Sequence, residues 1–175
     1  DGASVRIMNR RRFLAGVAGA GALAGGAWFA RSGGTADALS PVTVETLDAS
    51  GSTAGELTLF DGGVAVVDLF ATTCPPCEPQ VRNLATARER LDVQFVSVTN
   101  EALGGALTRD DLRNWWADAG GDWPVALDAK GAVTRTLAAR NLPYTAVVDG
   151  DQVAWGEAGT TAPETVVSAV EEVTG

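Results

Sequence analysis

The sequence predicts one α/β domain built on a central mixed β-sheet that is flanked by helices. Strand-like and helix-like patterns alternate along residues 41–175, which is typical of a sheet sandwiched by helices. The run at residues 64–70 is almost continuously apolar, as in a strand that is covered on both faces. Roughly 140 residues make up this region, which is enough chain for a single domain with its own core.

The first half of the domain begins with an N-terminal β-hairpin. Apolar and polar residues alternate over 42–47 and 56–60, and the hairpin is expected at an edge of the sheet. The apolar run at 64–70 is then the central strand. Apolar residues spaced by three and four predict a helix over 75–90, and a second buried strand follows at 92–98.

The second half adds a helix–strand–helix block before a final hairpin and helix. Thr108 and Asp111 have the spacing of a capping box, which opens a helix that Gly120 and Gly121 end. The remaining elements are expected as a strand at 124–127, a helix at 130–140, a strand at 145–148, the turn Asp149-Gly150 into a strand at 152–155, and a helix at 163–173. The predicted order is ββ-βα-β-α-β-α-ββ-α.

The only two cysteines, Cys74 and Cys77, form a Cys-x-x-Cys pair directly after the central strand. In a helix that begins at Cys74, free backbone N–H groups and the positive end of the helix dipole favour a thiolate at that residue. Cys77 lies one turn later, close enough to close an intramolecular disulfide once Cys74 is joined to a substrate. The pattern predicts reversible dithiol chemistry in which Cys74 attacks and Cys77 resolves.

Three other interpretations of the pair compete with this one. A structural zinc site needs about four ligands, and the chain has no histidine and no further cysteine. A stabilising cross-link gains little because the loop encloses only Pro75 and Pro76. A pair of inert buried thiols remains an alternative, although the preceding strand and the two prolines favour a redox site.

The N-terminal segment resembles a twin-arginine export signal. Met8 is the only methionine and the expected start of translation; Arg10 and Arg11 follow it, and residues 13–30 are uncharged and mildly apolar. A bilayer span needs roughly 17 to 25 residues, so release and membrane tethering through residues 13–30 both stay open. The expected organisation is residues 1–7 upstream of the start, 8–30 a signal or N-terminal anchor, 31–40 a linker, and 41–175 the domain.

The expected exported part is strongly acidic. Residues 31–175 carry nine arginines and lysines against 21 aspartates and glutamates, a formal balance of −12. Such a surface repels phosphate backbones and anionic headgroups, which argues against a nucleic-acid partner. The acid excess with Lys130 as the sole lysine resembles proteins from very salty surroundings, which concerns habitat rather than activity.

Two motifs carry a resemblance to thioredoxin-fold proteins. These are Cys74-Pro75-Pro76-Cys77 after one strand and Asn141-Leu142-Pro143-Tyr144-Thr145 before another. The early hairpin and the block at 108–140 are similar to extracytoplasmic TlpA/ResA-type thiol-disulfide oxidoreductases, and the resemblance covers residues 41–173. It implies a reductant of exported partner proteins that uses no organic cofactor or metal.

The resemblance also implies roles for other residues. Pro143 stands at the place of a cis-proline opposite the redox pair, where the backbone of Leu142 pairs with a substrate segment; alternatively, Pro143 only starts a strand. Asp68 matches a buried acid whose raised pKa lets it shuttle a proton for Cys77; alternatively, Asp68 reaches water at a strand end. Thr73, Pro75 and Pro76 are expected to contact the substrate.

Some residues depart from the family pattern. Thr73 replaces the usual tryptophan, which removes a flat recognition surface and leaves a candidate helix cap. Pro79 is expected to bend the helix or delay its regular hydrogen bonds. Because Pro75 and Pro76 lack N–H groups, only a modest lowering of the Cys74 pKa is expected.

The leading hypothesis is therefore an exported disulfide reductase that acts on protein thiols and disulfides and is recharged by an upstream electron donor. A peroxiredoxin-type peroxidase is one alternative, although Ala71 and Thr72 do not reproduce that group's proline and threonine. A Cu(I)-binding or copper-delivery module is another, although related proteins also use a histidine. The direction of exchange depends on the reduction potential, which the motif does not set.

Overall fold

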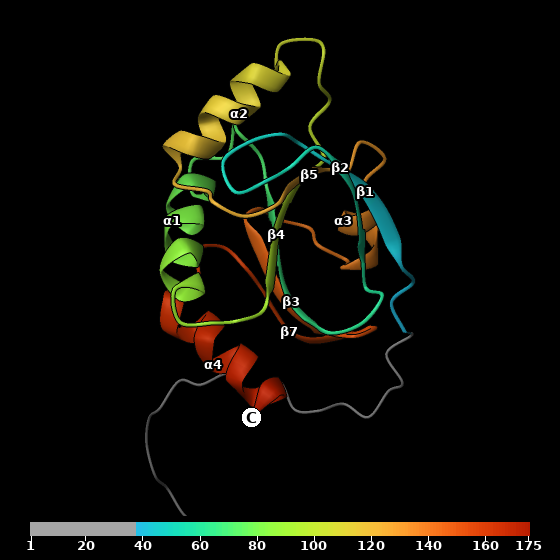
Figure 1. Cartoon of the computed structure of the whole chain (residues 1–175), viewed down its shortest axis with the longest axis vertical. Helices are drawn as coiled ribbons and strands as arrows, with labels where there is room; N and C mark the ends of the chain where they lie inside the picture. Colours follow the sequence, from blue (N-terminus) through green and yellow to red (C-terminus); the bar gives the residue numbers. More distant parts are fainter. Residues whose placement is uncertain (1–37) are drawn as a thin grey trace, which may run out of the picture. The chain divides into compact units, whose positions relative to one another are not determined.

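The computed structural model describes residues 38–175, which form seven strands and four helices around one sheet (Figure 1). The order of strands and helices is the predicted one. The elements are β1 (Val42–Thr46), β2 (Gly55–Leu59), β3 (Val64–Phe70), α1 (Cys77–Arg88), β4 (Gln94–Thr99), α2 (Arg109–Asp118), β5 (Val125–Leu127), α3 (Ala132–Thr136), β6 (Tyr144–Asp149), β7 (Gln152–Ala158) and α4 (Pro163–Thr174).

The seven strands lie in the order β2-β1-β5-β4-β3-β6-β7. Strands β3, β4 and β5 are parallel, whereas β6 runs antiparallel to β3 and the β1–β2 hairpin pairs antiparallel through β1 with β5. The hairpin therefore lies at a sheet edge and β3 is central, as predicted. The mixed α/β architecture with an added helix–strand block is confirmed.

Each face of the sheet has its own apolar core, because side chains alternate between the faces along a strand. From β3, Val66 and Phe70 pack with buried residues of α1, α2 and α4, whereas Val67 and Leu69 pack with Val133 of α3. Figure 1 shows α1 and α4 on one side of the sheet and α3 on the other. Helices covering both faces leave the carboxyl ends of β3 and β4 as the place where loops meet.

Helix α1 begins later than predicted. Its first residue is Cys77 and its N-cap is Pro76, and the first backbone bond to it runs from the N–H of Gln80 to the carbonyl of Pro76, at 3.3 Å. An earlier start would require Pro79 to donate an N–H that proline lacks. Pro79 lies in the first turn, where no helical partner is needed, so this proline sets the start of the helix.

Helix α3 is much shorter than the predicted span of 130–140. The carboxylate of Asp128 accepts hydrogen bonds from the backbone N–H groups of Ala132 (2.6 Å) and Thr134 (3.2 Å) and so satisfies the start of the helix. At the other end, Ala138 has a positive φ of 51°, which an α-helix does not allow. The chain leaves the helix there and continues towards β6.

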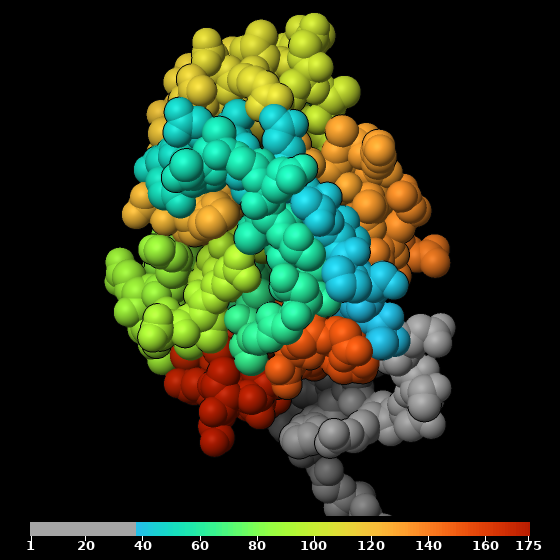
Figure 2. Space-filling view, turned by 45° about the vertical axis from the view of Figure 1, so that its right-hand side comes forward, coloured from blue at the N-terminus to red at the C-terminus, as the bar shows by residue number. Residues whose placement is uncertain are grey.

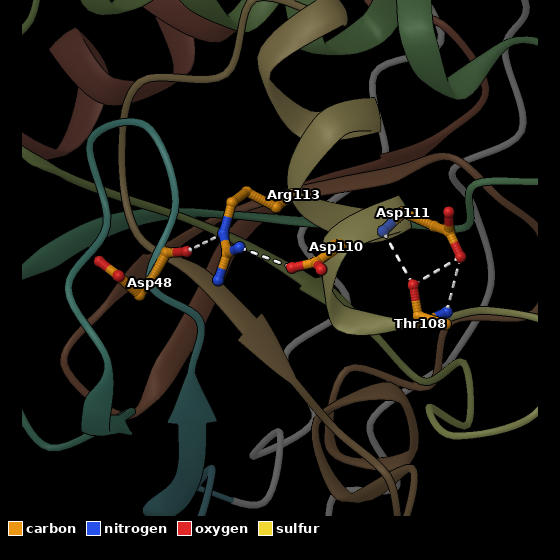
Figure 3. Close-up of polar contacts among 5 residues, drawn as sticks. All are labelled: Asp48, Thr108, Asp110, Asp111 and Arg113. Carbon is orange, nitrogen blue, oxygen red and sulfur yellow. Dashed lines mark hydrogen bonds and ion pairs between the residues drawn. The ribbon is translucent and has the colours of Figure 1, made fainter.

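Helix α2 begins with the predicted capping box (Figure 3). The N–H of Asp111 donates to the Thr108 hydroxyl at 3.1 Å, and the N–H of Thr108 donates to the Asp111 carboxylate at 3.0 Å. These bonds hold the pKa of Asp111 below its usual value. Arg113 then ties the helix to the loop after β1 by donating to the carbonyl of Asp48 at 2.7 Å.

Within residues 38–175, no helix is long and apolar enough to cross a membrane. The signal or anchor expected at residues 8–30, and the residues before it, lie outside the described part of the chain. The linker expected at 31–40 is described only from residue 38 onward.

The indole ring of Trp116 leaves no room for a side chain at Gly121, which follows α2. A Cβ atom built on Gly121 would lie 2.1 Å from Cε2 of the buried Trp116, whereas one on Gly105 would meet nothing within 4 Å. We expect Gly121→Ala to lower the free energy of unfolding by about 1 to 3 kcal/mol through overpacking. The matched control Gly105→Ala should change it by less than about 0.5 kcal/mol. Urea unfolding of both variants measures this; equal stabilities would contradict the packing.

Candidate active site

A disulfide joins Cys74 and Cys77 at the carboxyl end of β3, with the two Cα atoms 5.4 Å apart. Cys74 lies in the turn between β3 and α1, and Cys77 is the first residue of the helix. Cys74 is partly exposed, whereas Cys77 is completely buried. Only Cys74 is open to an approaching molecule, so the two sulfurs are distinguished by their surroundings.

Helix α1 does not begin at Cys74. The prediction that the helix start stabilises a thiolate on Cys74 required it to begin there. The N–H of Cys74 donates to the carbonyl of Ala71 at 3.1 Å, and that of Cys77 donates to the carbonyl of Cys74 at 3.0 Å. Pro75 and Pro76, both exposed, have no N–H to offer. Few backbone donors are therefore left for a thiolate on Cys74.

Thr73 is exposed and does not cap the helix, because the N-cap is Pro76 and no side chain bonds there. The predicted cap is thus wrong, and a different residue holds this loop. The carboxylate of Glu101 accepts from the backbone N–H of Thr72 at 2.7 Å and from its hydroxyl at 2.9 Å. Glu101 also accepts from Thr99 at 3.1 Å, so it anchors the segment before Cys74 to the end of β4.

The peptide bond between Leu142 and Pro143 is cis, the geometry that the resemblance implies for this position. Pro143 is buried and directly precedes β6, which pairs antiparallel with β3. Leu142 and Cys74 are both partly buried and pack against the same core cluster. The cis-proline loop and the disulfide therefore share one end of the sheet.

Asp68 lies in the middle of β3 with only 1% of its surface exposed, so the alternative in which it reaches water is wrong. Its neighbours in register are Ser97 on β4 and Thr145 on β6. The hydroxyl of Ser97 donates to the carboxylate at 3.1 Å and that of Thr145 at 3.4 Å. Burial raises the pKa of Asp68 to about 7, although both hydrogen bonds oppose the rise.

Ser97, Asp68 and Thr145 form a buried polar row across three strands, and a second set of hydrogen-bond donors extends this row on both sides. The indole N–H of Trp123 donates to the Ser97 hydroxyl at 3.0 Å. The amide of Gln80 donates to the Thr145 hydroxyl at 2.9 Å and accepts from the backbone N–H of Thr161 at 2.7 Å. In each hydrogen bond of this row the donor lies farther from Asp68 than the acceptor does. Gln80 connects the row to α1, the helix that carries Cys77.

Sequence reasoning missed Ser97, Thr145, Gln80 and Glu101. Polar residues inside otherwise apolar strands, and a buried glutamine on the inner face of a predicted helix, were signals that could have found the first three. No comparable signal marks Glu101, because its contact with Thr72 depends on how two loops meet.

The Redoxin family model matches residues 34–173, which is most of the chain. The chain belongs to the Redoxin family. No curated protein sequence matches this family member. Among residues 38–175, no three or more histidine, cysteine, aspartate or glutamate side chains gather as a metal site would require.

Solved structures share the thioredoxin-like fold of this Redoxin family member at low sequence identity. StoA from Bacillus subtilis is 12% identical with a TM-score of 0.62, and the match covers 75% of this chain and 97% of StoA. A putative thiol:disulfide interchange protein DsbE from Chlorobium tepidum is 21% identical, with a TM-score of 0.60 and coverage of 79% and 96%. Peroxidoxin BcpB from Mycobacterium tuberculosis is 16% identical, with a TM-score of 0.59 and coverage of 79% and 97%.

The buried carboxyl group makes folding stability depend on pH. Because the pKa of Asp68 is about 7 in the folded chain and 3.8 for an ordinary aspartate, the folded state binds the proton more tightly. The contribution of Asp68 to stability should therefore be greatest below about pH 4, decline by a few kcal/mol as the pH rises to 7, and level off above pH 7. We expect Asp68→Asn in the oxidised protein to remove this decline.

Urea unfolding of the oxidised protein from pH 4 to pH 8 measures the effect. The difference in stability between Asp68→Asn and the unmodified chain should widen as the pH rises from 4 to 7 and then change little up to pH 8. Asp149→Asn, which removes an exposed carboxylate at the end of β6, serves as the control and should leave the pH slope unchanged. Parallel pH profiles for Asp68→Asn and the unmodified chain would show that Asp68 is not protonated in the folded state near neutral pH.

Proposed function

We propose that this protein is a thiol-disulfide oxidoreductase that reduces disulfides in other proteins. The observation that carries the proposal is the unequal exposure of the paired sulfurs: Cys74 is accessible and Cys77 is completely buried beneath it. A substrate reaches only Cys74, and the second cysteine acts after the first has reacted. Membership of the Redoxin family and the fold it shares with thiol-disulfide oxidoreductases support the same chemistry.

The reaction consists of two exchanges that start from the reduced pair. The Cys74 thiolate attacks one sulfur of a substrate disulfide, forms a mixed disulfide and releases the other substrate sulfur as a thiolate that takes up a proton. Cys77 then loses its proton and attacks the sulfur of Cys74, which releases the second substrate thiol and closes the intramolecular disulfide. Two electrons and two protons pass to the substrate, and an upstream dithiol donor restores the reduced pair.

Asp68 is the proposed acceptor for the proton that Cys77 loses. Val66 and Phe70, two positions before and after Asp68, pack in one cluster with Cys77, so the carboxyl group faces the same side of the sheet as the buried thiol. With a pKa of about 7, Asp68 is divided between its two protonation states at neutral pH. A group in that state is suited to take a proton from a thiol and to return it.

The substrate is proposed to bind along the cis-proline loop. The backbone of Leu142 pairs with an extended segment of the substrate, as in other strand-addition complexes. Thr73, Pro75 and Pro76 are exposed around Cys74 and would form the other side of the contact. Pro143 keeps this edge free of a competing backbone donor.

The peroxidase and Cu(I)-binding alternatives require different chemistry from Cys74 and Cys77. A peroxidase needs Cys74 to be oxidised by hydrogen peroxide, and a Cu(I) module needs both thiolates to bind the ion tightly. Adding hydrogen peroxide with a thiol donor tests the first. Copper titration against a chelator tests the second.

The exchange is tested by insulin reduction with dithiothreitol as the donor. The unmodified chain should accelerate it at least tenfold, and Cys74→Ser should reduce the rate to that of dithiothreitol alone because the attacking sulfur is lost. Cys77→Ser should turn over poorly but accumulate a mixed disulfide with the substrate, visible by mass spectrometry without reductant. A Cys74→Ser variant as fast as the unmodified chain refutes the proposal.

We further propose that the protein works outside the cytoplasm after export by the twin-arginine route, supported by Arg10, Arg11 and the uncharged stretch that follows. The double change Arg10→Lys and Arg11→Lys should leave nearly all of the protein in the cytoplasm of a bacterial host that has this route. Arg12→Lys changes an arginine outside the pair and should not affect export. Cell fractionation measures the distribution, and export of the double variant would exclude the route.

A further inference from the structure

Positive charge is unevenly distributed along this acidic chain. Residues 38–175 contain eight arginines and lysines against 20 aspartates and glutamates. Residues 129–148, which include α3 and the cis-proline loop, contain three of the eight cations and no acidic residue. In Figure 2 the orange part of this stretch forms a continuous area of the surface. This stretch, with a formal charge of +3, therefore contains the loop where a substrate is proposed to bind.

The last of these cations lies at the rim of a cavity of about 200 Å³. Apolar residues from the ends of β3 and β4 and from the cis-proline loop form part of its wall, and four polar residues complete the lining, of which Thr134 already contacts Asp128. The cavity is lined by Leu69, Phe70, Val98, Leu142, Asn100, Arg140 and Asn141, together with Thr134 and Ala139. Asn141 and Leu142 line the cavity and belong to the cis-proline loop, and Phe70 lies four positions before Cys74 in the sequence. The cavity therefore borders the loop where a substrate is proposed to bind.

The polar groups at the rim are free to bind a ligand. Arg82, Arg109 and Arg113 each form an ion pair within residues 38–175, whereas Arg140 has no carboxylate within ion-pair distance in that part of the chain. Asn100 and Asn141 donate no side-chain hydrogen bond to another described residue. A guanidinium group and two amides thus present unused N–H donors around one opening.

The neighbouring carboxylates do not occupy these donors. Asp128 lies behind Thr134 and accepts from the N–H groups of Ala132 and Thr134. Glu101 follows Asn100 and accepts from Thr72 and Thr99. Both are held by partners of their own, which reduces but does not remove their repulsion of an anion.

The size and chemistry of the cavity select its occupant. Pockets for drug-sized ligands and cofactors measure about 300 to 1,000 Å³, so this cavity is too small for them and suits a single side chain. An apolar wall with a cationic, donor-rich rim matches a short aliphatic stem that ends in a carboxylate. That description fits glutamate and, with one methylene fewer, aspartate.

We propose that this cavity is a specificity pocket that receives an acidic side chain of the substrate protein, located near the cysteine that Cys74 attacks. The proposal rests on the disulfide exchange proposed above and names the class of substrate for that site. Arg140 pairs with the carboxylate while Leu142 aligns the substrate backbone. Selection arises because the net charge of the rest of the domain disfavours acidic segments everywhere else on its surface.

The test uses peptides that differ only at the residue beside a single cysteine, which is glutamate, glutamine or lysine. Each peptide is blocked at both ends, and its cysteine is joined in a disulfide to 2-mercaptoethanol, a neutral thiol. The pre-reduced full chain should reduce the glutamate peptide about three- to fivefold faster than the glutamine peptide, as expected for an exposed ion pair. The lysine peptide should be slowest, whereas the net charge of the protein alone predicts the opposite order.

Two variants separate the pocket from the overall charge. Arg140→Gln should abolish the preference for glutamate, and Arg90→Gln, which removes the same charge just beyond the far end of α1, should preserve it. If both variants lost the preference for the glutamate peptide equally, the preference would arise from the electrostatic field of the whole domain, and the pocket would be overturned. A glutamine peptide with a free terminal carboxylate that matched the glutamate peptide would assign the cavity to chain ends instead of acidic side chains.

The outcomes also distinguish this inference from the function on which it rests. Equal rates for all three peptides, each well above those of Cys74→Ser, would overturn the pocket and leave the exchange chemistry in place. Rates no higher than those of Cys74→Ser would refute both.

Discussion

The central constraint of this structure is a carboxyl group buried in the middle of the central strand. Removing Asp68 from water is expensive, and the fold offsets the cost with hydroxyl donors from both neighbouring strands. Those hydroxyls are held in turn by Trp123 and Gln80. The row therefore connects three strands with the redox helix, and each member depends on its neighbours being in register.

This arrangement also places the two cysteines in different environments. Cys77 and Asp68 are both buried on the same side of the sheet, so the proposed acceptor for the Cys77 proton lies inside the protein, away from water. Cys74 stands outside that enclosure, in a turn where prolines and occupied N–H groups offer little support for a thiolate. Under the proposed mechanism, attack on a partner takes place at the surface, whereas the closing step takes place in the core.

Patterns along the chain predicted the order of all eleven elements, the central position of β3 and the paired cysteines, because each depends on local periodicity or spacing. The delay that Pro79 was expected to impose on α1 is observed, although the predicted start at residue 75 was two residues too early, because the apolar spacing does not mark the first residue of a helix. The early end of α3 arises at Ala138, an ordinary residue forced into a left-handed conformation by its surroundings. Glu101 escaped prediction because its partner Thr72 is distant in sequence and is brought near only by the parallel pairing of β3 and β4.

In the proposed function, Thr73 offers a partner protein no large aromatic surface next to Cys74. The proposed pairing through the backbone of Leu142 would accept almost any extended segment, because main-chain hydrogen bonds do not depend on side-chain identity. Discrimination then has to come from a side-chain pocket next to that backbone. The cavity lined by Arg140 and Leu142 lies next to that backbone, and none of its lining residues belongs to the buried row around Asp68. Under this proposal the choice of substrate can vary without disturbing that row.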